Sequence, residues 1–202
     1  ECDVSAWTDI ISVVAGDDHT VGLKSNGTVV AVGQSSESFN PLDVSSWTDI
    51  IAIAVSDNAT YGLRSNGTVV TTNQYEKEEL SKWKDVVDIS AHTHIVGVDS
   101  KNKILTLDGF GHYGEGTACE WEDKLEIVYA GYYHTIGISE TGEIYFSGMN
   151  WGDCDFASWP NDIIAISSER EHTIGLRADG SVVATGENKN GRCNVSNWNL
   201  FK

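Results

Sequence analysis

A tryptophan recurs every 36 to 40 residues along this 202-residue chain. The recurring positions are Trp7, Trp47, Trp83, Trp121, Trp159 and Trp198. The flanking sequence repeats with them, since C-D-V-S-A-W-T-D-I-I at residues 2–11 returns as L-D-V-S-S-W-T-D-I-I at residues 42–51. A second marker agrees, because H-T-V-G-L-K at 19–24 returns as H-T-I-G-L-R at 172–177. Self-similarity at this period is typical of repeat architectures such as solenoids and propellers.

Each unit reads as short strands joined by tight turns. The run D-I-I-S-V-V-A-G is apolar and β-branched, and T-V-G-L-K then turns through S-N-G into T-V-V-A-V-G. Asn26-Gly27 and Asn66-Gly67 predict type I′ hairpins, since both residue types accept positive φ. A fourth short strand is expected at C-D-V-S. The pattern therefore predicts an all-β protein, a β-propeller of five four-stranded blades with about 39 residues per repeat.

The five units together form one predicted domain, because a lone blade cannot cover both of its faces. We expect a single β-propeller domain over residues 1–202. Its units run roughly over residues 2–41, 42–80, 81–119, 120–157 and 158–198.

The repeat resembles the regulator of chromosome condensation repeat. The fifth unit carries the pattern most fully, from Asp162-Ile163-Ile164 through His172-Thr173-Ile174-Gly175-Leu176 to Gly186-Glu187-Asn188-Lys189-Asn190-Gly191. The resemblance covers almost the whole chain and implies a propeller, which in this family usually closes with seven blades. This chain supplies five and carries the same C-x-V-S-x-W half-unit near both ends. Either five blades close or the chain is part of a longer array, and we favour closure because an open arc leaves an apolar face bare.

The net charge of the chain restricts the classes of partner that it is expected to bind. The chain has 30 Asp and Glu against 13 Lys and Arg, a formal charge of −17. Nucleic acids and anionic membranes select basic patches, so neither is an expected partner. No apolar run approaches the roughly 20 residues of a membrane span. A secreted or cell-surface location is favoured over a cytoplasmic one.

The repeats differ most in the loops after the first and third strands, which emerge on one face of a blade. The hairpin turns and crossovers on the other face are near-copies, which suggests a scaffold. Aromatic and acidic side chains on rigidly held loops are typical of protein-binding surfaces. The alternative is loop drift, with these aromatics packing on their own blades. The candidate partner-binding residues are Asp17, Asp18, Phe39, Asp57, Tyr75, Glu76, Phe110, His112, Tyr113, Tyr132, Tyr133, Trp151 and Glu171.

A histidine occupies one slot in four units, as His19, His94, His134 and His172. Equivalent slots on separate blades are too far apart to ligate one zinc ion, so we expect each histidine to hydrogen-bond to backbone groups between blades instead. The G-x-G-x-x-G match at residues 109–114 opens no helix, which the dinucleotide motif requires. No catalytic motif, metal site or cofactor is predicted.

Cysteine usage does not indicate a disulfide framework. Cys2, Cys154 and Cys193 share a slot that Leu42 fills in another copy, which indicates apolar packing. We expect Cys119 and Cys154 to stay reduced, while Cys2 and Cys193 remain a plausible pair.

These observations predict a non-enzymatic protein-binding module whose partner, another protein, carries a basic or apolar patch. Within the family, the chain resembles in character the propeller-type β-lactamase inhibitory proteins, and this resemblance implies an inhibitory role. One alternative is a carbohydrate-binding propeller lectin, although lectin sites should recur in every blade and these aromatic slots do not. A second alternative is a regulator of a GTPase resembling an exchange factor.

Overall fold

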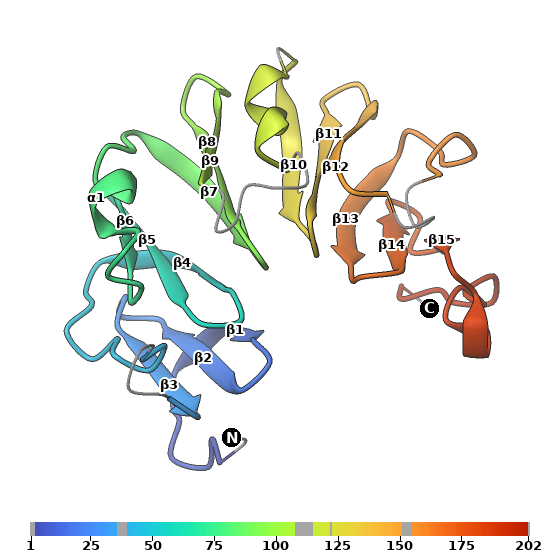
Figure 1. Ribbon diagram of the computed structural model, residues 1–202. Coiled ribbons are helices and arrows are strands. Elements are labelled where there is room, and N and C mark those ends of the chain that lie inside the picture. The colour runs from blue at the N-terminus through green and yellow to red at the C-terminus, as the bar shows by residue number, and fades with distance from the viewer. Residues whose placement is uncertain (1–2, 36–39, 108–114, 122, 151–154, 202) are drawn as a thin grey trace. The chain divides into compact units, whose positions relative to one another are not determined.

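The computed structural model describes residues 3–35, 40–107, 115–121, 123–150 and 155–201. The chain divides into two compact units, residues 1–109 and 110–202. Five three-stranded antiparallel sheets follow one another along the chain, three in the first unit and two in the second (Figure 1). The fold is therefore all-β with five blades, as the repeat predicts.

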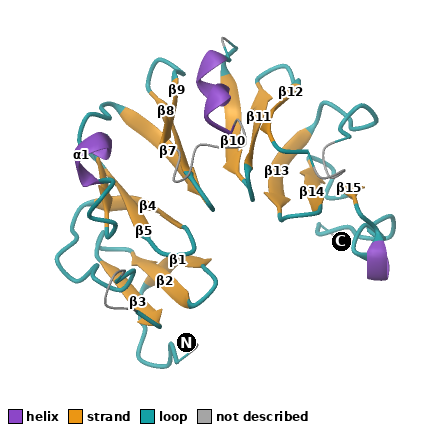
Figure 2. Ribbon diagram, viewed as in Figure 1, coloured by secondary structure: helices purple, strands orange, loops and turns teal. Residues whose placement is uncertain are grey.

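The strands have the following bounds. Those of the first unit are β1 (Ile10–Ala15), β2 (His19–Lys24), β3 (Val29–Gly33), β4 (Ile50–Val55), β5 (Thr60–Arg64), β6 (Val69–Thr71), β7 (Val86–Ala91), β8 (Ile95–Asp99) and β9 (Ile104–Leu107). Those of the second unit are β10 (Leu125–Ala130), β11 (His134–Ser139), β12 (Ile144–Gly148), β13 (Ile163–Ser168), β14 (His172–Arg177) and β15 (Val182–Gly186). The short helical segments are α1 (Lys77–Leu80) and η1 (Glu115–Glu120), which lie in connections between strands, and η2 (Lys189–Gly191), which follows β15 (Figure 2).

The predicted fourth strand is wrong for the described residues. The segment before each marker tryptophan forms a tight turn instead, in which the tryptophan amide donates to the carbonyl three residues earlier, at 2.9 Å for Trp7 to Val4 and 3.0 Å for Trp47 to Val44. Polar side chains in these segments bond locally, as Ser5 does to Asp3, and such bonds compete with a sheet ladder. Each described blade therefore has three strands, preceded by a turn that ends at the marker tryptophan.

The hairpins at Asn-Gly are present, but their turn type differs from the prediction. Gly27 has φ +78°, whereas Asn26 is not among the residues with positive φ. The amide of Gly27 donates to the carbonyl of Lys24 at 2.9 Å, and the amide of Lys24 donates to the carbonyl of Thr28 at 2.9 Å. The loop is thus a three-residue hairpin that ends in a left-handed glycine, a G1-type bulge, rather than a type I′ turn. In the third blade Asn102, with φ +62°, takes the place of the glycine.

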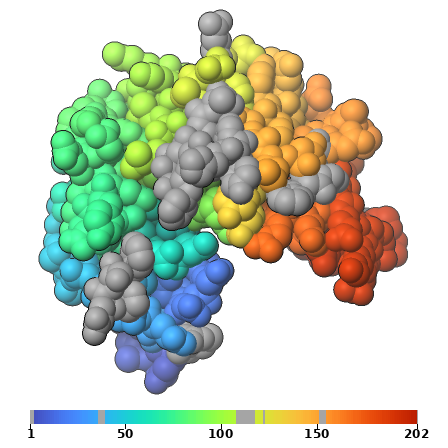
Figure 3. Space-filling model, viewed as in Figure 1, coloured from blue at the N-terminus to red at the C-terminus, as the bar shows by residue number. Residues whose placement is uncertain are grey.

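The apolar core lies between neighbouring blades. In the first unit, Val21 and Leu23 of β2 pack with Ile50 and Ile53 of β4, and the equivalent cluster joins the second and third blades. In the second unit, Ile138 of β11 packs with Trp159 and Ile163, and the fourth and fifth blades are in contact in the space-filling view (Figure 3). Burial between blades explains why strands that would be exposed in a lone sheet are apolar.

The marker tryptophans occupy equivalent positions before their blades. Trp47, Trp83 and Trp159 are buried, and Trp7 and Trp121 are partly buried. Trp198 follows the last blade and is 51% exposed. The prediction of five repeat-equivalent packed tryptophans is confirmed.

The structure describes two of the four cysteines. Cys119 and Cys193 carry free thiols, so Cys193 is not paired, while Cys2 and Cys154 lie outside the described residues.

In the described part of the chain, no helix is long and apolar enough to cross a membrane.

Candidate functional site

The loops after the first and third strands of a blade lie side by side. The amide of Met149, after β12, donates to the carbonyl of Tyr133, after β10, at 2.9 Å. The amide of Glu187 donates to the carbonyl of Glu171 at 2.7 Å in the fifth blade, and Gln34 donates to Asp18 at 2.8 Å in the first. Backbone bonds therefore hold the two variable loops together at one end of each of these blades.

In the second unit, loops from two blades meet in an aromatic cluster. Tyr132 and Tyr133 pack edge to face, with ring centroids 4.3 Å apart. The guanidinium carbon of Arg170, from the fifth blade, lies 4.1 Å from the centroid of the Tyr132 ring. A cation over an aromatic face at this distance is an attractive cation–π contact. We call Tyr132, Tyr133 and Arg170 the aromatic–arginine cluster.

Tyr133 has an unusual backbone conformation. Its φ is +63°, in the left-handed region, whereas the corresponding residues of the first and fifth blades, Asp18 and Glu171, do not have positive φ. For residues other than glycine, this conformation costs about 1 to 2 kcal/mol. Such strain often occurs at functional sites, because the fold must hold it against a relaxed alternative.

The charged neighbours of this cluster are mixed. Glu171 accepts a 2.7 Å bond from Arg192, and this bond lowers the pKa of the Glu171 carboxyl. Arg170 lies between Glu169 and Glu171 in sequence, yet in the described part of the chain no carboxylate forms an ion pair with it. Its guanidinium therefore rests on an aromatic ring and keeps hydrogen-bond donors for another group.

The first unit presents acidic residues at its loops. Asp17, Asp18 and Asp57 are exposed. Asp18 and Asp57 line a small cavity of about 130 Å³ with Pro41, between the first and second blades. Two carboxylates at one cavity give it a negative potential, which would attract a basic group of a partner.

Tyr75 and Glu76 point in different directions. Tyr75 is 75% exposed. The hydroxyl of the buried Tyr61 donates to the carboxylate of Glu76 at 2.8 Å. Burial raises the pKa of Glu76 and also that of the Tyr61 hydroxyl. Glu76 is thus bonded to its own blade, whereas Tyr75 is free to contact a partner.

Five of the predicted binding residues lie outside the described residues. They are Phe39, Phe110, His112, Tyr113 and Trp151.

Two of the recurring histidines, His19 and His134, hydrogen-bond to a neighbouring blade. The Nε2 of His19 lies 3.3 Å from Oγ1 of Thr60 on the second blade. The Nε2 of His134 lies 2.9 Å from Oγ of Ser168 on the fifth blade. These partners on the neighbouring blade are side-chain hydroxyls, whereas the sequence predicted backbone groups. Nδ1 of His134 does meet a backbone group, the carbonyl oxygen of Tyr132 in its own blade, at 3.2 Å. Across the described ranges, no three His, Cys, Asp or Glu side chains are grouped to hold a metal ion.

Sequence reasoning missed Arg170. In the sequence it is one cation within S-E-R-E-H, so it reads as part of a solvated acidic loop. Its partner Tyr132 lies 38 residues earlier, and only the packing of two blades brings them together. The sequence does contain one signal, because Arg170 stands two residues before the H-T-I-G motif of its unit, as Tyr132 does in the preceding unit.

Comparisons with known proteins identify the repeat. Residues 10–38 match the family described as the regulator of chromosome condensation (RCC1) repeat. No curated protein matches the chain.

Solved structures of similar fold include the CRINKLY WD40 ectodomain of the receptor kinase ACR4 from Arabidopsis thaliana, with 19% identity, a TM-score of 0.66, and coverage of 88% of this chain and 66% of that one. Another is Prp20p from Saccharomyces cerevisiae, described with its binding properties to Gsp1p and histones, with 18% identity, a TM-score of 0.67, and coverage of 88% and 57%. Human WBSCR16 has 11% identity, a TM-score of 0.69, and coverage of 94% and 65%.

These likenesses establish the fold. The chain spans between 57% and 66% of the length of these three structures. Together with the repeat match, they support an RCC1-type repeat propeller.

Proposed function

We propose that this chain is a non-enzymatic protein-binding module and that the loops after the first and third strands of its blades recognise the partner. The observation that carries the proposal is the aromatic–arginine cluster. It combines two tyrosines with an arginine, the residue types that dominate binding hot spots. Two adjacent blades fix its members, so little conformational entropy is lost when a partner binds.

The expected partner is a protein with apolar and basic groups on its contact surface. The tyrosine rings offer apolar area, and the carboxylates of Asp17, Asp18 and Asp57 favour basic groups. Similarity to Prp20p, whose printed description names Gsp1p and histones as binding partners, supports a protein as the ligand class. An inhibitory action on the partner, which the family resemblance implies, remains part of this proposal.

A capture experiment tests the proposal. The full chain is immobilised beside a matched Tyr132→Ala/Arg170→Ala variant, and both are exposed to an extract of the native host. Proteins retained by the wild-type chain and lost by the variant are identified and purified, and their affinities are then measured directly. The proposal fails if every retained protein binds the two chains equally well.

A second candidate is a regulator of a GTPase that acts like an exchange factor. The structural likeness to Prp20p favours it over other regulatory functions. Its test is the rate of nucleotide release from a purified GTPase of the native host, with and without the chain. A lectin function has less support, because the tyrosine pair of the fourth blade has no counterpart in the G-D-D-H loop of the first. A glycan-binding screen tests that alternative.

A further inference from the structure

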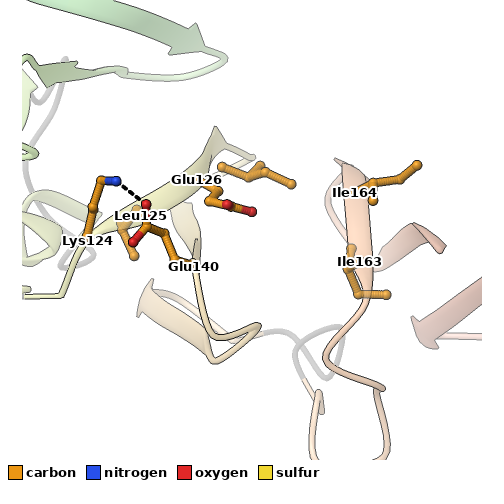
Figure 4. A pocket seen from close by; sticks show the side chains of 7 residues that line it. Lys124, Leu125, Glu126, Glu140, Ile163 and Ile164 are labelled. Atoms are coloured by element: carbon orange, nitrogen blue, oxygen red, sulfur yellow. Dashed lines mark hydrogen bonds and ion pairs between the residues drawn. The ribbon is translucent and has the colours of Figure 1, made fainter. Parts of the chain in front are cut away.

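A pocket of about 500 Å³ lies between the first strands of the fourth and fifth blades, both in the second unit. It is lined by Lys124, Leu125, Glu126, Ile127, Glu140, Ile163 and Ile164 (Figure 4). They lie at the start of β10, directly after β11 and at the start of β13, whereas Tyr132 and Tyr133 follow the opposite end of β10. The pocket is therefore separate from the aromatic–arginine cluster.

The sequence departs from the repeat at this pocket. In the strand pairing, Leu125 faces Ser139 as Ile10 faces Lys24 and Ile163 faces Arg177, which aligns the units residue by residue. The fourth unit alone has charged residues in two of three slots that are otherwise uncharged, and it reverses the charge in the third. Lys124 stands where the other units have Asp9, Asp49, Asp85 and Asp162; Glu126 where they have Ile11, Ile51, Val87 and Ile164; Glu140 where they have Ser25, Ser65, Ser100 and Ala178.

The backbone at the pocket keeps the repeat conformation. The amide of Glu140 donates to the carbonyl of Lys124 at 3.2 Å, as the amide of Ser25 donates to that of Asp9 at 2.9 Å. The register irregularity near the start of the strand, between Leu125 and Ile127, is also that of the other blades. The replacements therefore change the chemistry of the pocket and not its local fold.

Two of the three charges neutralise each other. Lys124 and Glu140 form an ion pair across the two loops. Glu126 forms no ion pair within the described residues, and it is exposed. In Figure 4 its carboxylate lies on the β10 side of the pocket, opposite Ile164 on β13. The pocket thus has one unneutralised negative charge beside apolar walls.

We propose that this pocket binds a primary alkylammonium group. The carboxylate of Glu126 pairs with the ammonium, and the apolar stem packs on Ile127, Ile163 and Ile164. The pocket is open to solvent, and its exposed lining combines a larger polar share with the apolar side chains of β10 and β13. Its volume is within the usual range for ligand sites. The group has two possible sources, the side chain of a lysine on a partner protein or a free small amine.

NMR titration of the full chain tests the proposal with n-butylammonium chloride, which has the four-carbon stem of lysine. We expect amide shifts at residues 124–127 and 163–164. Neutral n-butanol, with the same stem, is the matched ligand and should bind more weakly. Equal shifts with n-butanol, or none at these residues with the amine, would overturn the proposal.

Variants separate the charge from the fold. Glu126→Ile restores the residue of three other units, so it should fold normally, and Glu126→Gln removes only the charge. Both should weaken butylammonium binding about fivefold, since an exposed ion pair contributes up to about 1 kcal/mol. Glu120→Gln removes the same charge from a surface position outside the pocket and should leave binding unchanged. Unchanged affinity in Glu126→Ile would refute the role of Glu126.

Two further ligands identify the source of the alkylammonium group. A blocked lysine peptide that binds more tightly than n-butylammonium identifies a protein side chain, with a norleucine peptide as the uncharged control. Tighter binding of the free amine identifies a small molecule.

Discussion

The indole ring of Trp159 lies directly over Gly175 of strand β14, so closely that a Cβ on Gly175 would be 2.5 Å from the Trp159 Cζ3 atom. The contact recurs in every blade. The other pairs are Trp7 with Gly22, Trp47 with Gly62, Trp83 with Gly97 and Trp121 with Gly137, each with an approach of 2.7 to 2.9 Å. The tryptophan and the glycine of the repeat are thus two parts of one packing contact, which fixes the turn before a blade on its second strand.

Gly175→Ala should therefore destabilise the protein. The added methyl group meets a ring that is itself buried between blades, and overpacking of this kind typically costs about 1 to 3 kcal/mol. Urea unfolding measures the change. In a Trp159→Phe background the smaller ring leaves room, so the same glycine change should cost less. Equal costs in both backgrounds would show that the indole ring is not the obstacle.

Truncation of the aromatic–arginine cluster should weaken partner binding. Tyr132→Ala removes the ring under Arg170, and Arg170→Ala removes the cation, so each should cost about 2 kcal/mol or more of binding free energy. The double variant should lose less than the sum, because the two side chains act through one contact. Calorimetry with the captured partner provides these values.

Asn26→Ala is the control for that series. The Oδ1 of Asn26 accepts bonds from the amide and the hydroxyl of Thr28, at 3.0 and 2.7 Å, within the hairpin turn. Its loss should lower stability by about 1 kcal/mol and leave affinity unchanged. If Asn26→Ala abolishes binding while Tyr132→Ala retains it, the recognition surface has been assigned to the wrong loops.

The repeat predicted those features that depend on local sequence and recur. The five blades, the hairpins and the tryptophan positions follow from spacing and apolar pattern, because each copy constrains the others. The fourth strand was wrong, since short segments such as Asp3-Val4-Ser5 satisfy their polar groups locally. Arg170 could not be predicted, because its position over Tyr132 depends on how two blades pack. Glu126 could have been found, since a charge among Ile11, Ile51 and Ile164 is visible in the sequence alone.

Two substitutions at Tyr133 should separate the effect of its backbone strain from that of its aromatic contact. Tyr133→Gly loses the edge-to-face contact with Tyr132 but accepts the φ of +63° without strain. Tyr133→Ala loses the same contact and keeps the strain. We expect the glycine variant to be the more stable of the two by about 1 kcal/mol, while both bind the partner more weakly. Equal melting temperatures for the two variants would mean that the backbone at Tyr133 is not strained.

His19 should make stability depend on pH. Its side chain is 2% exposed. The hydroxyl of Thr60 donates its hydrogen to the carbonyl of Pro41 at 2.7 Å, so Nε2 of His19 must carry the hydrogen of its 3.3 Å contact with Thr60. The neutral ring therefore has its proton on Nε2, and a second proton would have to enter the buried site at Nδ1. Burial lowers the pKa of His19, although Asp17 and Asp18 act in the opposite direction.

The lowered pKa fixes the sign of the effect. In the unfolded chain the histidine takes up a proton as the pH falls through about 6.5, while the folded chain takes it up only at lower pH. The unfolded state therefore binds more protons in this window, and the free energy of unfolding decreases as the pH falls from about 6.5 towards the folded pKa. His19→Gln retains an N–H that can donate to Thr60 but does not titrate. Urea unfolding between about pH 7 and pH 5 should show a shallower loss of stability for His19→Gln than for the wild-type chain. Parallel curves for the two proteins would mean that His19 is not buried in its neutral form.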